Sequence, residues 1–355
     1  MTFPINIYFA AVASAAITVL AALPLWRRWC LRTGLVDDPG HRKIHHQPIP
    51  LAGGLAVMTG MLLPVLVASA ALWWQGSYGV LGPDTTSPKA RSHTSTLVSA
   101  LDRNVESLLL YGLNRRALQL ATIFAGALGM LALGWWDDKY ELRPSLKFGS
   151  QLVVATLVAA GGTRITLFVP SLMFSYAITI LWILTVVNAL NFMDNMNGLC
   201  AGLGAISAWY FAVVAAADGQ YLVALIAYLT FGALLGFLPY NFPRAGVFLG
   251  DAGSHLVGYL MAILAILPHF SAPRHPQHWA VVIPLFVLAV PLADLVWVVL
   301  LRWRLGQPFY QGDTNHLSHR LTRRGLTHTQ AVLVIWLAAT LCGGLGCWFL
   351  NPRAP

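Results

Sequence analysis

LCAGLGAISAWYFAVVAAA at residues 199–217 and YLVALIAYLTFGALLGFLPY at residues 221–240 are consecutive apolar runs without Asp, Glu, Lys or Arg. An α-helix needs about 20 mostly apolar residues to cross the hydrocarbon core of a bilayer. Membrane-spanning β-strands would instead alternate apolar and polar residues. The two runs therefore predict two membrane-spanning helices joined by three residues.

The rest of the 355-residue chain has the same character, with 57% hydrophobic and 10% charged residues. Soluble proteins carry about 25% charged residues, so a soluble fold is a poor interpretation. We predict one all-α, polytopic membrane domain over residues 1–355. About ten spans are expected, of which the fourth and eighth are short: Ile5–Leu25, Leu51–Trp74, Ala117–Trp136, Gly149–Gly161, Leu172–Phe192, Leu199–Ala217, Tyr221–Tyr240, His255–Pro268, Trp279–Leu301 and Ala331–Leu350.

The basic residues predict the orientation of these spans. No basic residue precedes the first run, but Arg27, Arg28 and Arg32 follow it, which indicates an uncleaved first span with its N-terminus outside. Fourteen of the 22 Lys and Arg residues then fall inside, as the positive-inside rule requires. They lie in five inner segments: Trp26–Pro50, Asp137–Phe148, Met193–Asn197, Asn241–Ser254 and Arg302–Gln330.

The net charge of +9 does not indicate nucleic-acid binding, because the basic residues lie between apolar runs. Anchoring to the inner leaflet and binding of anionic substrates fit this distribution better. The four cysteines have no CxxC spacing. The outer loop Gln75–Arg116 carries Leu97, Leu101, Val105 and Leu108 at helical spacing, which indicates an interfacial helix without a catalytic signal.

The inner segments also hold eight of the 13 acidic residues. Asp137 and Asp138 are adjacent carboxylates at the end of the third span, followed by Lys147. A divalent cation or a proton would relieve their repulsion, although a solvated helix end is the plainer interpretation. A transporter would instead spread polar residues through the membrane midplane. Among the acidic residues, Asp294 alone lies inside a predicted span.

Three other inner segments carry candidate ligands. Asn188, Asn191 and Asp194 share one helical stripe and need either a ligand or neighbouring helices as partners. The loop 241–254 combines glycines with Phe248 and Asp251 before a helix start. This combination suits the binding of an anion and a metal, although an ordinary turn is the alternative interpretation. His316 and His319 lie one turn apart beside Arg320, and anion contact or acid–base work suits them better than zinc.

Five segments, taken together, resemble the polyprenyl-phosphate N-acetylhexosamine-1-phosphate transferase family, which is glycosyltransferase family 4. They occur in the order of that family and read RKIHHQPIPLAGG from Arg42, GWWDDK, NALNFMDNMNGLCAG, NFPRAGVFLGDAGS and GDTNHLSHRL. Two departures occur. Asn197 stands where the family commonly has Asp, and Ser318 stands where it often has His.

The resemblance implies the following site. Asp137 and Asp138 match an acidic pair that deprotonates the lipid phosphate, and Asp251 matches the Mg²⁺ ligand, with Asp138 nearby. Asn188, Asn191 and Asp194 match the nucleotide-sugar cleft, Phe248 lies near the uracil, and His316 and His319 lie near the diphosphate and sugar. We expect further substrate contacts from these residues: Arg42, Lys43, His45, Lys147, Asn197, Asn241 and Arg320.

The first segment is more similar to the GlcNAc-1-phosphate branch than to the muramoyl-pentapeptide branch. The expected reaction moves a sugar 1-phosphate, most simply GlcNAc 1-phosphate, from a UDP-N-acetylhexosamine to undecaprenyl phosphate with release of UMP. Mg²⁺, or Mn²⁺, is the expected cofactor. The expected location is the bacterial inner membrane, with a cytoplasmic active site and a homodimeric assembly. Another UDP-sugar donor, an anion transporter and an inactive relative remain alternatives.

Overall fold

The computed structural model describes residues 5–38, 47–79, 103–166, 169–268, 281–308 and 314–348. A two-stranded antiparallel sheet, β1 (Val36–Asp37) with β2 (Ile49–Pro50), accompanies twelve α-helices within these ranges. The helices are α1 (Ile5–Thr33), α2 (Gly53–Gly79), α3 (Arg103–Tyr140), α4 (Pro144–Ala160), α5 (Leu172–Phe192), α6 (Leu199–Ala217), α7 (Tyr221–Asn241), α8 (Gly250–Ile266), α9 (Ile283–Val287), α10 (Ala289–Arg304), α11 (Leu317–Arg323) and α12 (His328–Trp348).

Among the described residues, seven helices are long and apolar enough to cross a membrane, and α4 and α8 are shorter apolar helices of 17 residues each. The predicted all-α, polytopic membrane fold is confirmed. The bounds of α5 and α6 agree with the sequence prediction, whereas α4 and α8 each begin five residues earlier. Their first turns carry Lys147 and Asp251, which look like loop residues when only hydropathy is considered.

The predicted ninth span is broken into α9 and α10 at Leu288. Pro291 explains the break, because its ring excludes the carbonyl group four residues earlier and it has no N–H to donate. That carbonyl belongs to Val287 and accepts a hydrogen bond from Ser207 Oγ at 3.4 Å. A side chain of α6 thus satisfies the backbone group that the proline leaves unpaired, as a membrane interior requires.

Helix α8 lies at the centre of the bundle, and all of its residues except Asp251 and Ile266 are buried. Glycines allow its neighbours to approach closely. A Cβ atom added at Gly134 of α3 would collide with the backbone of Asp251 and Ala252, and one added at Gly54 of α2 would collide with the backbone of Gly253. The start of α8 is therefore fixed by direct backbone contact.

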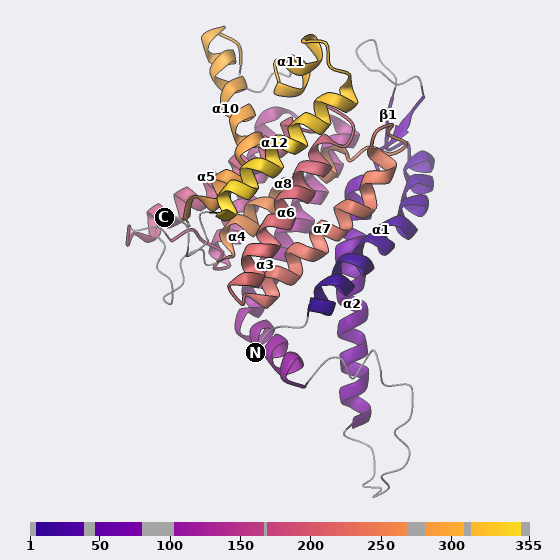
Figure 1. Ribbon diagram of the computed structural model, residues 1–355, viewed down its shortest axis with the longest axis vertical. Helices are drawn as coiled ribbons and strands as arrows, with labels where there is room; N and C mark the ends of the chain where they lie inside the picture. Colours follow the sequence, from indigo (N-terminus) through magenta and orange to yellow (C-terminus); the bar gives the residue numbers. More distant parts are fainter. Residues whose placement is uncertain are drawn as a thin grey trace, which may run out of the picture.

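The outer surface of the bundle exposes large apolar side chains, among them Phe9, Leu157, Leu181, Leu337 and Leu341. Such surfaces are unstable in water and are satisfied by lipid. At one end of the bundle lie β1 and α11, which come from opposite ends of the chain (Figure 1). The predicted interfacial helix lies partly outside the described residues, and from Arg103 onward its residues belong to the first turns of α3.

Candidate active site

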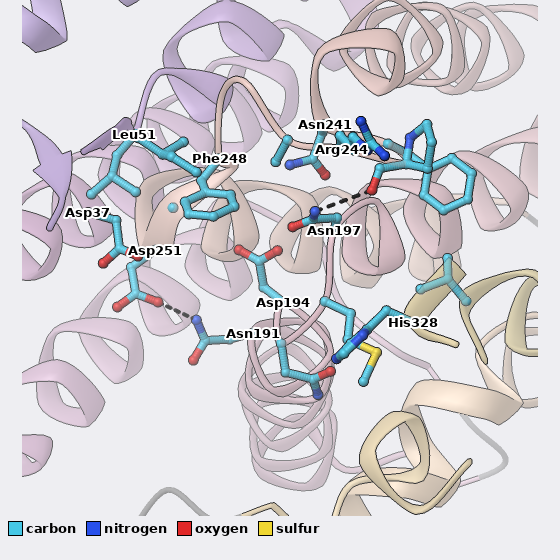
Figure 2. Close-up of a pocket in the computed structure, with 18 of the residues that line it drawn as sticks. Asp37, Leu51, Asn191, Asp194, Asn197, Asn241, Arg244, Phe248, Asp251 and His328 are labelled. Atoms are coloured by element: carbon cyan, nitrogen blue, oxygen red, sulfur yellow. Dashed lines mark hydrogen bonds between the residues drawn. The ribbon is translucent and has the colours of Figure 1, made fainter. Parts of the chain in front are cut away.

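A pocket of about 860 Å³ opens at this end of the bundle. Its walls come from β1, β2 and Leu51, from the ends of α3, α5 and α7 with the turns that follow α5 and α7, from the first turns of α4, α8 and α12, and from Thr314 and His319 at α11. Figure 2 shows Asn191, Asp194 and Asp251 around its centre, with Phe248 beside them. All five predicted inner segments thus contribute to one pocket, and these predicted site residues line it: Asp138, Lys147, Asn191, Asp194, Asn197, Asn241, Phe248, Asp251 and His319.

Asp138 caps the N-terminus of α8. Its Oδ1 accepts the backbone N–H of Asp251 at 2.7 Å, and its Oδ2 accepts that of Ala252 at 3.0 Å. The first N–H groups of a helix have no partner within the helix and favour a negative charge. Gly250 precedes them with φ +73°, a conformation that favours glycine. One carboxylate of the predicted pair therefore positions Asp251.

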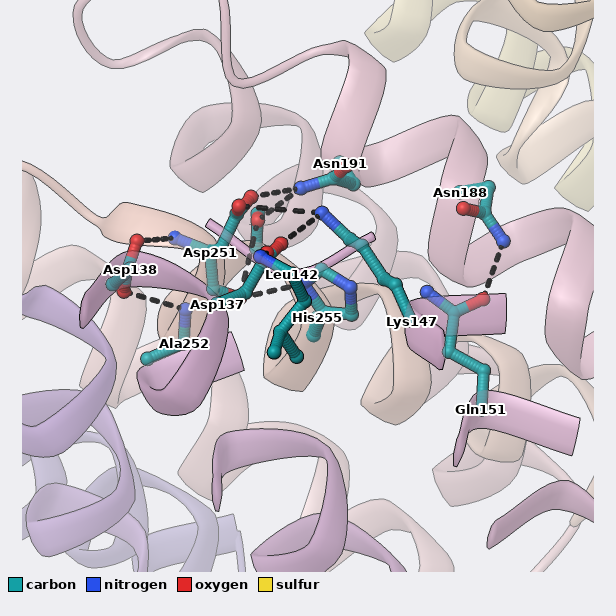
Figure 3. Close-up of polar contacts among 11 residues, drawn as sticks. Asp137, Asp138, Leu142, Lys147, Gln151, Asn188, Asn191, Asp251, Ala252 and His255 are labelled. Carbon is teal, nitrogen blue, oxygen red and sulfur yellow. Dashed lines mark hydrogen bonds and ion pairs between the residues drawn. The ribbon is translucent and has the colours of Figure 1, made fainter. Parts of the chain in front are cut away.

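Lys147 joins the other carboxylate of the pair to Asp251. Its Nζ atom lies 2.6 Å from Asp137 Oδ2 and 3.2 Å from Asp251 Oδ2 (Figure 3). Asp137 Oδ1 accepts the backbone N–H of Leu142 at 2.8 Å, which holds the turn between α3 and α4. One ammonium group thus partly balances two carboxylates, and Asp137, unlike Asp138, does not line the pocket.

The predicted stripe on α5 divides into two parts. Asn191 Nδ2 donates to Asp251 Oδ1 at 2.5 Å and contacts Ser254 Oγ at 2.9 Å, so it belongs to the pocket. Asn188 Nδ2 instead donates to Gln151 Oε1 of α4 at 2.8 Å and does not line the pocket. Gln151 is fully buried. In the sequence it is a single amide within an apolar run, and no pattern there indicates that it pairs with Asn188.

Asp194 follows α5 and lies where the negative charges meet. Burial raises the pKa of its carboxyl group well above the ordinary value, and the charges of Asp251 and Asp138 raise it further. A carboxyl group with a raised pKa can exchange a proton nearer neutral pH. Asp194 is thus suited to proton transfer or to binding a cation that lowers the local negative potential.

The loop between α7 and α8 is held by Asn241. Its Oδ1 accepts the backbone N–H of Gly198 at 2.7 Å, and its Nδ2 donates to the carbonyl of Val247 at 2.9 Å. Asn197, the residue that departs from the family pattern, donates to the carbonyl of Pro243 at 3.3 Å. These amides fix the wall beside Phe248, which presents a flat ring to the pocket.

The histidine segment, residues 314–320, also has some residues that line the pocket and others that lie outside it. His319 lines the pocket, and its pKa is lowered by burial first and then by the nearby His316, Arg323 and His328. His316 is buried behind it and pairs with Asp294. Arg320 lies outside the main pocket, with its guanidinium carbon 4.5 Å from the ring centre of Trp297. The predicted contacts Arg42, Lys43 and His45 lie outside the described residues.

Several residues that line the pocket were not among the predicted site residues: Asp37, Arg244, Thr314 and His328. Asp37 and Arg244 belong to predicted inner segments, but their spacing from other polar residues does not indicate a site. The sequence does not single out His328, because the last apolar run begins at Ala331, whereas α12 begins three residues earlier. Thr327 and Gln330 cap that first turn reciprocally, which is a recognisable sequence signal.

The donor set fits a magnesium ion that shares its ligands with a substrate. Within the described residues, no three His, Cys, Asp or Glu side chains are grouped closely enough to enclose a metal. Mg²⁺ is, however, usually held by one or two carboxylates together with substrate phosphates and water. Asp251 is 34% exposed toward the pocket, and Asp194 and Asp138 line it as well.

Comparison with known proteins identifies the family of the part of the chain that carries most of this pocket. Residues 120–269, which include Asp137, Asp138, Lys147, Asp194 and Asp251, match the glycosyl transferase family 4 profile. A probable undecaprenyl-phosphate N-acetylglucosaminyl 1-phosphate transferase of Bacillus subtilis is 32% identical over 329 residues, covering 90% of this chain and 79% of that protein.

Two further relatives cover nearly the whole chain. The decaprenyl-phosphate N-acetylglucosaminephosphotransferase of Mycobacterium tuberculosis is 30% identical over 374 residues, covering 96% of this chain and 82% of the relative. The undecaprenyl-phosphate α-N-acetylglucosaminyl 1-phosphate transferase of Escherichia coli K12 is 27% identical over 336 residues, covering 90% and 78%. The chain is therefore a member of glycosyl transferase family 4, the polyprenyl-phosphate N-acetylhexosamine-1-phosphate transferases.

Proposed function

We propose that this enzyme transfers GlcNAc 1-phosphate from UDP-GlcNAc to undecaprenyl phosphate, releasing UMP. The names of the relatives from Bacillus subtilis and Escherichia coli support this donor and this acceptor. The observation that carries the proposal is the pocket itself, in which carboxylates, amides and imidazoles from distant segments meet at one end of an apolar helix bundle. A water-soluble nucleotide sugar and a lipid phosphate can both reach such a place.

The proposal places the pocket on the cytoplasmic face of a bacterial inner membrane, with the N-terminus outside. Its support is the distribution of basic residues: Arg27, Arg28 and Arg32 end α1, and Lys139 ends α3 near the pocket. Cysteine introduced at exposed Asp38 should react with an impermeant maleimide only after the cells are opened. Reaction in intact cells would reverse the orientation. The predicted homodimer stays a prediction.

The chain's own residues divide the work. Asp251, with Asp194 beside it, would hold Mg²⁺ (or Mn²⁺), which when bound offsets the negative charge of the diphosphate. Lys147 adds a fixed positive charge, and Phe248 offers a stacking surface to the uracil. Of the predicted acidic pair, Asp138 is the one that faces the pocket, so it is the better placed to take the last proton of the lipid phosphate.

The freed phosphate oxygen then attacks the β-phosphorus of the donor, and the bond between the β-phosphorus and the bridging oxygen breaks as UMP leaves. The products are UMP and undecaprenyl diphosphate-GlcNAc, so atoms and charge balance. Positioning and charge stabilisation supply most of the rate in phosphoryl transfer. The arrangement of Lys147 between two carboxylates provides such fixed charge before substrate binds.

The test uses purified protein in detergent with radiolabelled UDP-GlcNAc, undecaprenyl phosphate and Mg²⁺. The expected result is a labelled lipid and one equivalent of UMP, both lost when the lipid phosphate is omitted. A panel with UDP-GalNAc, a UDP-linked deoxyhexosamine and UDP-MurNAc-pentapeptide identifies the donor. A correctly folded protein that consumes none of these donors, or that carries them across vesicles unchanged, would contradict the proposal.

A further inference from the structure

Asp294 is a buried carboxylate that the proposed reaction leaves without a role. It lies on α10 in the same buried stripe as Val290, Val298 and Arg302, which recur every four residues. Its residue is 4% exposed, and it does not line the main pocket. An ionised carboxylate in an apolar helix loses its hydration and persists only where polar groups replace the water. Its contacts therefore indicate its role.

Both oxygens of Asp294 accept hydrogen bonds from the histidine segment. Oδ2 lies 2.7 Å from Nδ1 of His316, and Oδ1 accepts the backbone N–H of Leu317 at 2.6 Å. An imidazole beside a carboxylate keeps its proton on the nitrogen that faces it, so Nδ1 of His316 carries hydrogen and Nε2 carries the lone pair when the ring is neutral. The second bond fixes the first turn of α11.

Further contacts, with the end of α5 and the turn after it, hold the same segment. The ring of His316 packs against Phe192 at the end of α5, with 5.5 Å between ring centres and an angle of 71°. Ser318 Oγ donates to Asn195 Oδ1 at 2.6 Å. Thr314 and His319, which flank these anchored residues, line the main pocket. A displacement of His316 or Leu317 would therefore move two side chains of the pocket wall.

We propose that Asp294 is a positioning residue of the transfer reaction. It holds the His316 ring in the Nδ1–H tautomer and thereby holds residues 314–319 against the pocket. The inference rests on the proposed function, because its readout is the rate of that reaction. Asp294 acts through His316 and lies outside the main pocket.

Asp294→Asn is the informative variant, because an amide has one acceptor oxygen where the carboxylate has two. If that oxygen keeps the Leu317 N–H, the amide NH₂ group faces Nδ1 of His316 and forces the proton onto Nε2. We expect kcat to fall about 10- to 100-fold, the size of effect seen when a partner that orients a histidine is lost. The KM values of both substrates should change less than about threefold, since neither Asp294 nor its partners His316 and Leu317 line the main pocket.

A double-mutant cycle with His316→Ala separates positioning from mere helix capping. If Asp294 acts through the imidazole, Asp294→Asn should cost little further activity in the His316→Ala background. A pure capping role at Leu317 would instead cost the same factor in both backgrounds, and that result would overturn the proposal. Ser318→Ala is the matched control, because it removes an anchor of α11 but leaves the pair between carboxylate and imidazole intact.

Nitrogen-15 NMR of histidine-labelled protein gives a readout independent of turnover, with the His316 signal assigned by its absence from His316→Ala. At alkaline pH, His316 should be the Nδ1–H tautomer in the wild type and in Ser318→Ala, and the Nε2–H tautomer in Asp294→Asn. An Nε2–H tautomer in the wild type would contradict the inference. A wild-type protein with the expected tautomer but no transferase activity would instead contradict the proposed function.

Discussion

Lys147 of α4 and Asp251 of α8 form an ion pair across 104 residues of sequence, with 3.2 Å between Nζ and Oδ2. The same ammonium lies 2.6 Å from Asp137. This pairing places a positive charge between two carboxylates at the floor of the pocket.

Lys147→Gln removes that charge but keeps much of the side-chain length. We expect kcat/KM for UDP-GlcNAc to fall by about 10²- to 10³-fold, the usual effect of losing one fixed group that stabilises developing charge. The thermal midpoint should fall as well, because Asp137 is buried and loses its countercharge. Lys147→Arg keeps the charge and should retain more activity than Lys147→Gln. Equal activity of the two variants would show that the charge is not used.

Asp251→Asn tests the metal site. The amide keeps one acceptor oxygen for Asn191 but loses the negative charge that attracts a divalent cation. We expect transfer to be abolished at Mg²⁺ concentrations that saturate the wild type, while the protein still inserts in membranes. In the wild type, EDTA should stop the reaction and added Mg²⁺ or Mn²⁺ should restore it. Wild-type rates in Asp251→Asn, or full activity in EDTA, would contradict a metal role.

Asp194→Asn should stabilise the protein at neutral and alkaline pH. Burial, together with Asp251 and Asp138, raises the pKa of Asp194. A group whose pKa is raised by folding contributes stability that is present below its ordinary pKa and is lost as pH rises through the raised value. At about pH 8, well above the ordinary carboxyl pKa, the amide should raise the thermal midpoint by about 1–2 °C, as expected for about 1 kcal/mol in a chain of this size.

The gain in Asp194→Asn should shrink as pH falls toward about 4, near the ordinary carboxyl pKa, because Asp194 is then protonated in the wild type as well. Unfolding in detergent, followed by tryptophan fluorescence across this pH range, measures the effect. Asp38→Asn, which neutralises an exposed carboxylate, is the control and should show no such pH-dependent gain. A midpoint of Asp194→Asn below that of the wild type at pH 8 would count against this account.

Gly134→Ala tests the close contact between α3 and α8. The added Cβ would collide with the backbone of Asp251 and Ala252, so α8 must shift and carry Asp251 with it. We expect a lower thermal midpoint and a loss of activity of at least about tenfold, since small misplacements at a catalytic centre are costly. Gly149→Ala in α4 meets no atom within 4 Å and should be neutral or stabilising by about 0.5–1 kcal/mol.

The sequence predicted the fold well wherever hydropathy alone decides the structure. Uninterrupted apolar runs such as Leu172–Phe192 became helices with the predicted bounds, because lipid leaves the backbone few alternatives. The helix starts at Pro144 and Gly250 were placed too late, because Lys147 and Asp251 are charged yet lie within first turns. Their charges are balanced by each other, and that pairing across distant segments cannot be read from a local pattern.

The candidate site was predicted as a set of residues but not as an arrangement. The motifs indicated that Asp137, Asp138 and Asp251 belong together, but not that Asp138 would cap α8 while Asp137 pairs with Lys147. His316 and Asn188 were expected to face the substrate, yet Asp294 and Gln151 bind them outside the main pocket. In each case the partner lies on another helix and has no sequence spacing that announces the contact.

Helices α4 and α8 are 17 residues long, which corresponds to about 26 Å at 1.5 Å per residue, whereas a bilayer core is about 30 Å thick. Their first turns carry Lys147 and Asp251, which contact Asp137, Asp138 and Asn191 at the ends of α3 and α5. The floor of the pocket therefore lies where these longer helices end. A phospholipid-like acceptor can therefore present its headgroup to that floor while its long isoprenoid tail stays immersed. The nucleotide sugar therefore leaves bulk water to enter the pocket, whereas the isoprenoid tail of the acceptor stays in the hydrocarbon core.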